Sequence, residues 1–355
     1  EGSLYPQLPP GTERVLRIPE AGLTPLDRVL ITLTSLIVVG SVAWVPVVYA
    51  WAWRRWSQIP KEQKRRRMIY GALLVILLAM GPLAPHHSKS LGKWSNFTKW
   101  SLWKAWTRFM AVEVLTESAS NEDKPFDRFT DQSIFAIIPH GVFPFALGFA
   151  FVPEQVRRAI GYFRPVVAPA VAFFPFVRTV ISWCGKVFAD LGSVDAALTR
   201  GDPIGMAPGG IAEIFEGYPK PGTHPDEEYA IIRRRKGFIR MAIKHGIPVL
   251  PVYCFGATKM LKRLQLPAIF ETISNALHVS LVVAFGVWGL PIPFRQKLLY
   301  VLGNPIHPPS SHATDGAMLE KQVDDMHEQF CNELARLFEK YKEYYGWDRK
   351  VLKLV

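Results

Sequence analysis

The chain opens with two long apolar stretches that are separated by a short basic one. Residues 29–52 contain no charged side chain. In a helix that rises about 1.5 Å per residue they are long enough to cross a hydrocarbon core of about 30 Å. A second, shorter apolar stretch covers residues 68–85. The pattern predicts a transmembrane helical hairpin over residues 29–85, preceded by a polar segment, residues 1–28.

Basic residues flank both ends of this hairpin. The positive-inside rule places the Lys/Arg-rich connector, residues 53–67, in the cytosol. A second basic cluster follows the hairpin and weakens this bias: Lys89, Lys93, Lys99, Lys104 and Arg108. A re-entrant hairpin that does not fully cross the bilayer satisfies both clusters, so the topology stays open.

Residues 94–115 carry an aromatic residue at nearly every third position, interleaved with Lys and Arg. A spacing of three spirals around a helix, so the rings face most sides of it. Tryptophan together with basic residues is typical of a membrane interface, and an ordinary core helix is the alternative. We therefore expect residues 86–130 to form an interfacial helix followed by a linker.

From residue 131 the pattern changes to short apolar strands that alternate with helical segments. We expect strands at 134–138, 204–207, 229–232, 247–255 and 298–302, with an apolar segment at 165–171. We expect helices near 176–184, 238–245 and 260–278, and a long amphipathic helix that begins near Asp315. The alternation predicts an α/β domain over residues 131–355, with helices on the faces of a sheet.

The composition limits the classes of partner that we expect for this chain. The net charge is +12 and 49% of the residues are hydrophobic, which favours a large core and an anionic partner. No nucleic-acid-binding motif is visible, so we expect no nucleic acid. The chain has only three cysteines, Cys184, Cys254 and Cys331, and no pair of them is close in sequence. We therefore expect neither a disulfide framework nor a metal site.

The strongest candidate for chemistry is His140. It follows the predicted strand 134–138 in the stretch SIFAIIPHGVFPF, where Pro139 and Gly141 make a turn. The carboxyl edge of a sheet is where α/β proteins usually hold their ligands, so His140 is a candidate general base. A histidine that is hydrogen-bonded in the core is the alternative. After it, Phe143, Phe145 and Phe149 are expected to face lipid.

Two further stretches are suited to binding anions. Gly209, Gly210 and Glu213 lie at a predicted strand-to-helix junction, where backbone amides bind an anion or a developing oxyanion. Arg233, Arg234, Arg235 and Lys236 precede Gly237 and a helix, a cluster suited to several phosphates on one ligand. A solvated run of charges is the alternative for this cluster.

Together these stretches resemble the type-2 diacylglycerol acyltransferase family, which includes monoacylglycerol and wax-alcohol acyltransferases. The resemblance covers residues 133–308, and the hairpin corresponds to the family's membrane anchor. Its most specific part is RKGFIRMAIKHG, residues 235–246, continued by PVY and FG. Ile138-Pro139-His140-Gly141 is similar to the family's His-Pro-His-Gly, and GGIAE at 209–213 to its Gly-Gly-x-x-Glu. Residues 303–306, GNPI, resemble its late Gly-x-Pro-Ile turn.

One departure bears on mechanism, because Ile138 replaces the first histidine of the family motif. His140 remains the one candidate base in that motif. The Asp that glycerolipid acyltransferases carry five residues after their histidine is Phe145 here, so we expect Glu213 to orient the His140 ring. The resemblance implies that backbone amides at Gly141, Gly209 and Gly210 stabilise the oxyanion.

The resemblance implies an enzyme with a glycerolipid-acyltransferase-like sheet flanked by helices. It implies transfer of a fatty acyl group from acyl-CoA, a co-substrate, to the hydroxyl of diacylglycerol, with no cofactor. Residues 233–237 then hold coenzyme A. The alternatives are a wax-alcohol or monoacylglycerol acyltransferase, and a catalytically silent lipid-binding protein. The expected location is the endoplasmic reticulum membrane, with a cytosolic catalytic domain, or the lipid droplet. Whether the chain forms a homo-oligomer stays open.

Overall fold

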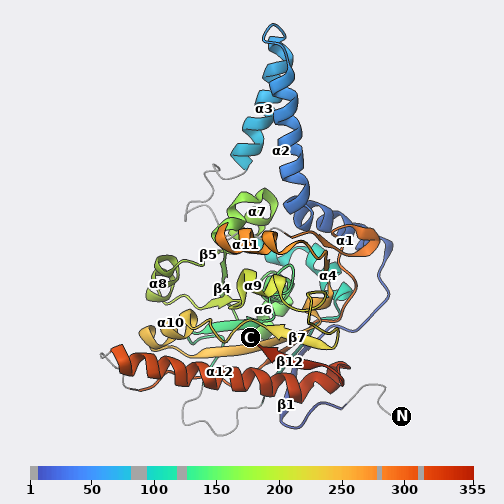
Figure 1. Cartoon of the computed structure of the whole chain (residues 1–355). Coiled ribbons are helices and arrows are strands. Elements are labelled where there is room, and N and C mark those ends of the chain that lie inside the picture. The colour runs from blue at the N-terminus through green and yellow to red at the C-terminus, as the bar shows by residue number, and fades with distance from the viewer. Residues whose placement is uncertain (1–6, 81–93, 118–125, 278–281, 311–315) are drawn as a thin grey trace.

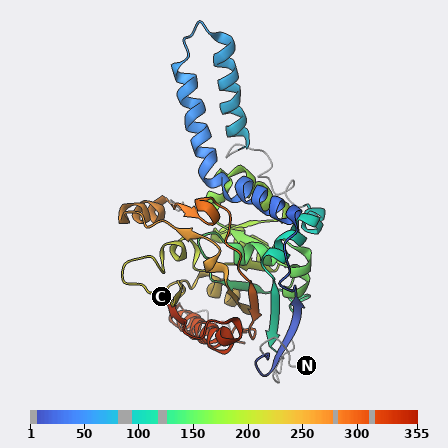
Figure 2. The same ribbon diagram turned by 90° about the vertical axis from the view of Figure 1, so that its right-hand side faces the viewer.

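The computed structural model describes residues 7–80, 94–117, 126–277, 282–310 and 316–355 (Figure 1). Several predicted features lie outside these residues: the end of the hairpin, 81–85; Lys89 and Lys93 of the second basic cluster; most of the linker, 118–125; and Asp315, the expected start of the last helix. The described part has a body built on one large sheet and a helical hairpin that projects from the body (Figure 2).

The sheet has eight strands in the order β1-β2-β11-β8-β3-β6-β4-β5. Their bounds are β1 Thr12–Arg17, β2 Glu113–Glu117, β3 Ile134–Ile138, β4 Arg164–Val167, β5 Val187–Phe188, β6 Ile204–Met206, β8 Val249–Phe255 and β11 Leu299–Leu302. Strands β8, β3, β6, β4 and β5 are parallel, so their carboxyl ends meet at one edge. Strand β11 runs antiparallel to β8, and β2 is parallel to β11.

Alternating side chains of the central strands enter two cores, one on each face of the sheet. On β3, Phe135 and Ile137 pack on one face, whereas Ile134, Ala136 and Ile138 pack on the other. Helices α4 Ser101–Phe109, α5 Phe145–Phe151, α6 Glu154–Ile160 and α7 Pro175–Trp183 cover the first face. Helices α8 Leu191–Thr199, α10 Gly237–His245 and α12 Gly316–Tyr345 cover the second (Figure 1). The predicted α/β fold is confirmed.

Smaller elements complete the body. They are the helix α9 Gly210–Phe215, the helix α11 Ala268–Leu277, the strand pairs β10 Ala284–Phe285 with β9 Lys262–Arg263 and β12 Val351–Leu354 with β7 Glu227–Ala230, and the short turns η3 Ser95–Lys99, η4 Pro169–Phe173, η5 Ala257–Lys259 and η6 Val287–Gly289. The predicted strand 229–232 is therefore not part of the main sheet. Its partner is the C-terminal strand β12.

The apolar N-terminal stretch is not one straight helix. Helix α1 Pro25–Thr34 and the π-helical turn η1 Ser35–Val39 lie along the body. The chain bends at Gly40 into α2 Ser41–Gln58, which pairs with α3 Lys64–Met80 in the projecting hairpin (Figure 2). Among the described residues no single helix is long and apolar enough to cross a membrane. The segments Pro25–Val39 and Ser41–Gln58, bent by 56°, pass that test only as a pair.

The predicted domain boundaries were too narrow for the sheet. Strand β1 comes from residues 1–28 and β2 from residues 86–130, yet both belong to the same sheet as β3. The aromatic segment was predicted as one helix, but α4 ends at Phe109 and β2 begins at Glu113. Phe97, Trp106 and Phe109 are buried in the core, whereas Trp94 and Trp100 are exposed. The helix predicted for 260–278 is formed only from Ala268 onward.

Candidate active site

His140 lies just beyond the carboxyl end of β3, where Gly141 adopts a left-handed conformation with φ +70°. Its imidazole Nδ1 is 2.7 Å from the carbonyl oxygen of Gly141. A carbonyl can only accept a hydrogen bond, so Nδ1 carries the proton and Nε2 keeps its lone pair. Burial lowers the pKa of His140 from its ordinary value, and the Gly141 carbonyl opposes this shift. The turn therefore holds a neutral imidazole with a basic Nε2.

Glu213, on α9, approaches His140 through the main chain. One carboxylate oxygen accepts a hydrogen bond from the backbone amide of His140, and the other accepts one from the amide of Ile231 at 3.0 Å. The expected bond from Glu213 to the imidazole is therefore replaced by a bond to the histidine's own backbone. Burial raises the pKa of Glu213 to about 7, whereas the two amides and the charge of Arg235 act in the opposite direction.

Different constraints favour glycine at the two positions 209 and 210, which precede Glu213. A Cβ on Gly209 would lie 2.3 Å from the carboxyl carbon of Glu213, so the carboxylate packs directly on this backbone. Gly210 has φ +57° and its amide donates to the carbonyl of Ala207 at 3.1 Å. The Gly210 amide is thus committed to the turn and is removed from the expected oxyanion set. In the described part of the chain, the amides of Gly141 and Gly209 have no hydrogen-bond partner.

The basic cluster is divided between the cavity and the surface. Arg234, Arg235 and Lys236 line the same cavity as His140, together with Gly237. Lys236 also forms an ion pair with Asp324 on α12, with a nitrogen–oxygen distance of 2.6 Å. Arg233 is not part of this lining, and its Nε donates to the carbonyl oxygen of Leu354 at 3.1 Å. The expected anion-binding set is therefore reduced to its last three cations.

The cavity has a volume of about 700 Å³, within the range of about 300–1,000 Å³ that is usual for ligand pockets. Its walls are mostly apolar and come from both halves of the chain. They include Val142, Phe143 and Leu147 after β3, Val166, Val171, Phe174 and Val177 around β4 and α7, and Val39, Val42, Ala43 and Pro291 at the base of the hairpin. The hairpin, which the apolar pattern predicts as a membrane anchor, thus also contributes its base to the cavity wall.

The three phenylalanines after His140 also have different surroundings. Phe143 lines the cavity. Phe145 and Phe149 are buried in the core, where their rings stack on each other, and Phe149 packs on Trp106. The prediction that these two side chains face lipid was wrong. The chain turns into helix α5 directly after the motif, and this helix directs both rings into the core.

Comparisons with known proteins identify the family of the chain. The sequence model of the family described as diacylglycerol acyltransferase matches residues 67–355. The chain is 25% identical to 2-acylglycerol O-acyltransferase 1 of Mus musculus over 276 residues, which are 72% of this chain and 76% of the relative. It is 25% identical to acyl-CoA wax alcohol acyltransferase 2 of Homo sapiens over 266 residues, 70% of this chain and 74% of the relative.

Diacylglycerol O-acyltransferase 2 of Homo sapiens is 24% identical over 285 residues, 73% of this chain and 67% of the relative. Among solved structures, the 1-acyl-sn-glycerophosphate acyltransferase PlsC of Thermotoga maritima aligns with a TM-score of 0.38 and 15% sequence identity. That alignment covers 87% of this chain and 96% of the other. Because the family model covers most of the chain, the chain belongs to the diacylglycerol acyltransferase family and is an acyltransferase.

Proposed function

We propose that this enzyme transfers a fatty acyl group from acyl-CoA to the free hydroxyl of diacylglycerol and so forms triacylglycerol. The observation that carries the proposal is the shared cavity: a neutral imidazole and four cations, Arg234, Arg235, Lys236 and Arg240, border one mostly apolar space. In this proposal the reaction takes place at the endoplasmic reticulum membrane, with the body in the cytosol and lipid droplets as a second location. It requires no cofactor besides the co-substrate acyl-CoA.

His140 acts as the general base in this reaction. Nε2 takes the proton of the acceptor hydroxyl while the hydroxyl oxygen bonds to the thioester carbonyl carbon. The carbonyl π electrons move to oxygen, and the unpartnered amides of Gly141 and Gly209 are suited to stabilise that charge. The intermediate then collapses, the carbon–sulfur bond breaks, and the protonated imidazole returns its proton to the leaving thiolate. The ester and free coenzyme A are the products.

The charges around the cavity support a donor that carries phosphates. Arg234 and Arg235 are exposed at the cavity, and Arg235 lies close enough to Glu213 for its charge to oppose the rise that burial causes in the pKa of that carboxyl group. One guanidinium group can donate two parallel hydrogen bonds to two oxygens of a phosphate group, which suits the nucleotide part of acyl-CoA. The apolar walls around Phe143 and Leu147 suit an acyl chain and a neutral lipid acceptor.

The acceptor is tested with a panel. The full chain is expressed in membranes of a host that lacks its own enzyme, and radiolabelled acyl-CoA is supplied with diacylglycerol, monoacylglycerol or a long-chain alcohol. We expect triacylglycerol as the main product and a loss of about 10²- to 10⁴-fold in His140→Ala. His224→Ala is the matched control, because His224 is exposed on a loop outside the cavity lining.

Each other outcome revises the proposal. Wax ester without triacylglycerol would assign a fatty alcohol as the acceptor, and diacylglycerol formation from monoacylglycerol alone would assign the shorter glyceride. Wild-type rates in His140→Ala would remove the imidazole from the mechanism. Protein that binds diacylglycerol but turns over no acyl-CoA would be a lipid-binding member of the family.

A further inference from the structure

Helix α1 is amphipathic with its apolar side turned outward. Leu26, Val29, Leu33 and Ile37, spaced by three or four residues, are all exposed. The opposite side is buried and partly polar: Asp27 forms an ion pair with Arg108, and the Thr34 hydroxyl accepts a hydrogen bond from the Trp106 indole at 2.9 Å. A surface helix of a globular body normally buries its apolar stripe. The helix is attached by these polar contacts and by Ile31, which is buried in the core, whereas Leu26, Val29 and Leu33 remain exposed.

A second apolar surface comes from residues distant in sequence. Ile269, Phe270 and Ile273 are exposed on α11. At the tip of η6, Trp288 is 84% exposed and adopts a left-handed conformation with φ +57°, which is unfavourable for a bulky side chain. The fold thus maintains an unfavourable backbone at the position where the most exposed of these aromatic rings projects into solvent.

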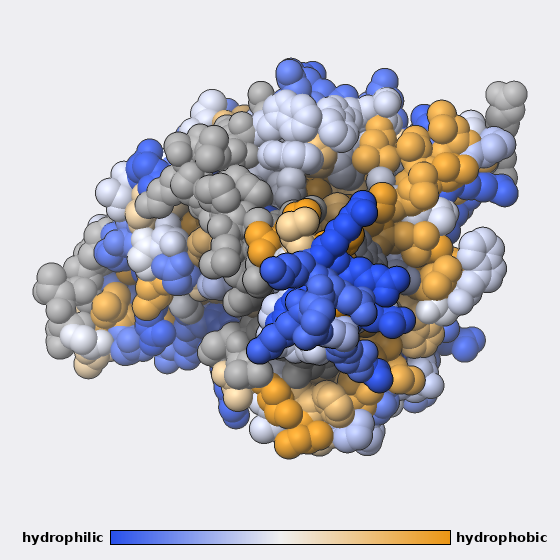
Figure 3. Space-filling model, turned by 90° about the horizontal axis from the view of Figure 1, so that it is seen from above, coloured by the Kyte–Doolittle hydropathy of each residue, from blue (hydrophilic) through white to orange (hydrophobic). Residues whose placement is uncertain are grey.

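Both surfaces lie beside the base of the hairpin. A Cβ on Gly40, at the bend between η1 and α2, would lie 3.1 Å from the ring of Pro291, just after η6. Trp44 on α2 contacts Phe176 on α7, with ring centroids 5.4 Å apart. Helices α1 and α11 are at the level of the hairpin base (Figures 1 and 2), and from above apolar side chains border the basic hairpin tip on two sides (Figure 3).

The length of the hairpin explains why such a surface is needed. Its charge-free legs, residues 41–53 and 68–80, each rise roughly 20 Å in a helix, about 10 Å less than a hydrocarbon core of about 30 Å. An interfacial apolar helix face sinks about 5–10 Å into the headgroup boundary. If the basic tip reaches the far headgroups, the near side of the body must enter the near interface. Trp51 and Trp53 are exposed near the hairpin tip, and Trp288 is exposed on the body. These two positions correspond to the two membrane–water interfaces, where tryptophan is enriched.

We propose that the body itself docks on the bilayer through a membrane-facing surface formed by α1, α11 and η6. Leu26, Val29 and Leu33 of α1 and Trp288 of η6 enter the near interface, and the hairpin supplies the rest of the depth. The cavity, whose lining includes Val39, Val42 and Pro291 at this level, is thereby held against lipid. The inference rests on the membrane setting of the proposed function but not on its chemistry.

The test is a depth measurement on the full chain in vesicles of phosphatidylcholine and phosphatidylserine. Nitroxide labels are attached to single cysteines made by Trp288→Cys, Leu33→Cys, Val47→Cys on the hairpin and Met318→Cys on α12. All four side chains are exposed, so folding should survive each change. The parent chain is the labelling control, because Cys254 and Cys331 are buried and burial raises the pKa of Cys184 to about 12.

We expect the ratio of collision rates with oxygen and with a water-soluble nickel chelate to be several-fold higher at positions 47, 33 and 288 than at 318. Lipid exposure at 47 with water exposure at both 33 and 288 would overturn the docking of the body while leaving the hairpin in place. Water exposure at 47 as well would also remove the membrane setting of the proposed function. Exclusion of both reagents at 288, with spin–spin broadening, would assign a second copy of the chain to this surface and overturn the proposal.

Discussion

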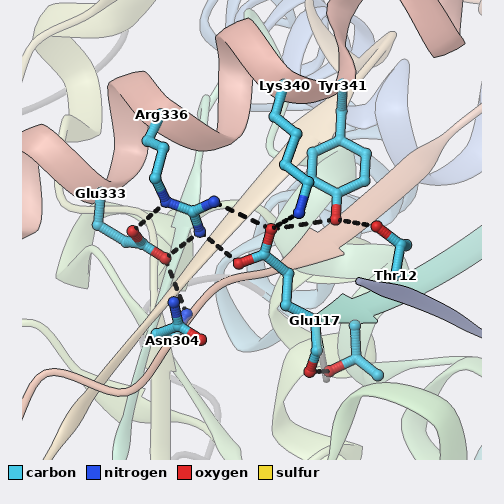
Figure 4. A network of polar contacts seen from close by, with 8 residues as sticks. Thr12, Glu117, Asn304, Glu333, Arg336, Lys340 and Tyr341 are labelled. Carbon is cyan, nitrogen blue, oxygen red and sulfur yellow. Dashed lines mark hydrogen bonds and ion pairs between the residues drawn. The ribbon is translucent and has the colours of Figure 1, made fainter. Parts of the chain in front are cut away.

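Glu213 is buried and Glu117 is half-buried; they lie at opposite edges of the same sheet, and their partners differ in kind. Glu117 ends β2, which runs antiparallel to β3, so it lies at the edge away from His140. Its carboxylate pairs with Arg336 and with Lys340 at 2.6 Å, and accepts a hydrogen bond from Tyr341 at 3.2 Å (Figure 4). These cations overcome the effect of burial, and the pKa of Glu117 is lowered.

Glu213 has backbone amides where Glu117 has cationic side chains. Burial is therefore only partly compensated and raises its pKa to about 7. The Glu117 network instead joins β1, β2 and α12, and through Glu333 it holds the amide of Asn304 in the turn after β11 (Figure 4). The comparison teaches that a cation-paired carboxylate at one edge stabilises the fold, whereas an amide-held carboxylate at the other positions the turn that carries His140.

Among the changes that test this comparison of the two glutamates, replacing Glu213 by Gln should have the largest effect. The new NH₂ group faces one of the two backbone amides, so the turn that carries His140 shifts, and a displacement of about 1 Å costs roughly 10²-fold in rate. Glu117→Gln is the matched control and should keep the wild-type kcat for folded enzyme. Equal kcat losses in the two variants, measured on detergent-purified protein, would show that the two edges do not differ in function.

Gly209→Ala should reduce kcat by tens of fold, which corresponds to an increase of about 2 kcal/mol in the activation free energy. The added Cβ would lie 2.3 Å from the Glu213 carboxyl carbon and must displace it. In Gly210→Ala nothing lies within 4 Å of the added Cβ, and the cost is that of the positive φ, about 1 kcal/mol of stability. A Gly210→Ala variant that loses as much kcat as Gly209→Ala would refute the packing argument.

Arg235→Gln should raise the KM for acyl-CoA about tenfold, because a charge-assisted phosphate contact contributes about 1.5 kcal/mol. Arg233→Gln should leave KM unchanged, because Arg233 is not part of the cavity lining. Initial rates against acyl-CoA concentration separate the two variants. A larger KM change in Arg233→Gln would place the donor on the other side of the basic cluster.

Stability should depend on pH in opposite directions at the two glutamates. The lowered pKa of Glu117 adds stability that is present above its ordinary value of 4.5 and is lost as the pH falls through the folded-state pKa. The raised pKa of Glu213 has the opposite effect, and stability falls as the pH rises from 4.5 to about 7. In detergent, Glu117→Gln should lose about 2 kcal/mol at pH 7 and less in acid.

Glu213→Gln should remove the fall in stability between pH 4.5 and 7. Apparent melting temperatures of the two variants and the wild type across this range provide the check. Parallel curves for the two variants would show that the carboxylates are equivalent. Glu117→Gln should change stability and leave the rate unchanged, because Glu117 is not among the residues that line the cavity.

Local patterns were sufficient for the central strands and failed for the edge strands. The apolar run of β3 and the helix α10 after Lys236 appear where they were predicted, because each carries its own periodicity. Strands β1 and β2 were missed because they come from the segments around the hairpin, which were predicted as a polar segment and an interfacial helix. Only their pairing with each other and with β11 identifies them. A sheet edge of this kind is a tertiary property.

The site was predictable as a set of residues but not as a set of bonds. His140, Gly209 and Glu213 converge because they follow β3 and β6, two parallel strands whose ends meet. Arg235 reaches the same cavity from the separate β7–β12 strand pair. No pattern in the sequence indicates that Glu213 binds a backbone amide and not the imidazole, or that Phe145 turns into the core. These details depend on the path of the turn after β3, where Gly141 is left-handed.

The most direct test of the neutral imidazole is the pH dependence of kcat/KM for acyl transfer in the wild-type enzyme. Because burial lowers the pKa of His140, activity should hold down to pH 6.5, the ordinary value, and fall only below it as Nε2 takes a proton. A fall centred near pH 7, where Glu213 titrates, or no acid limb at all, would contradict the assignment of His140 as the base.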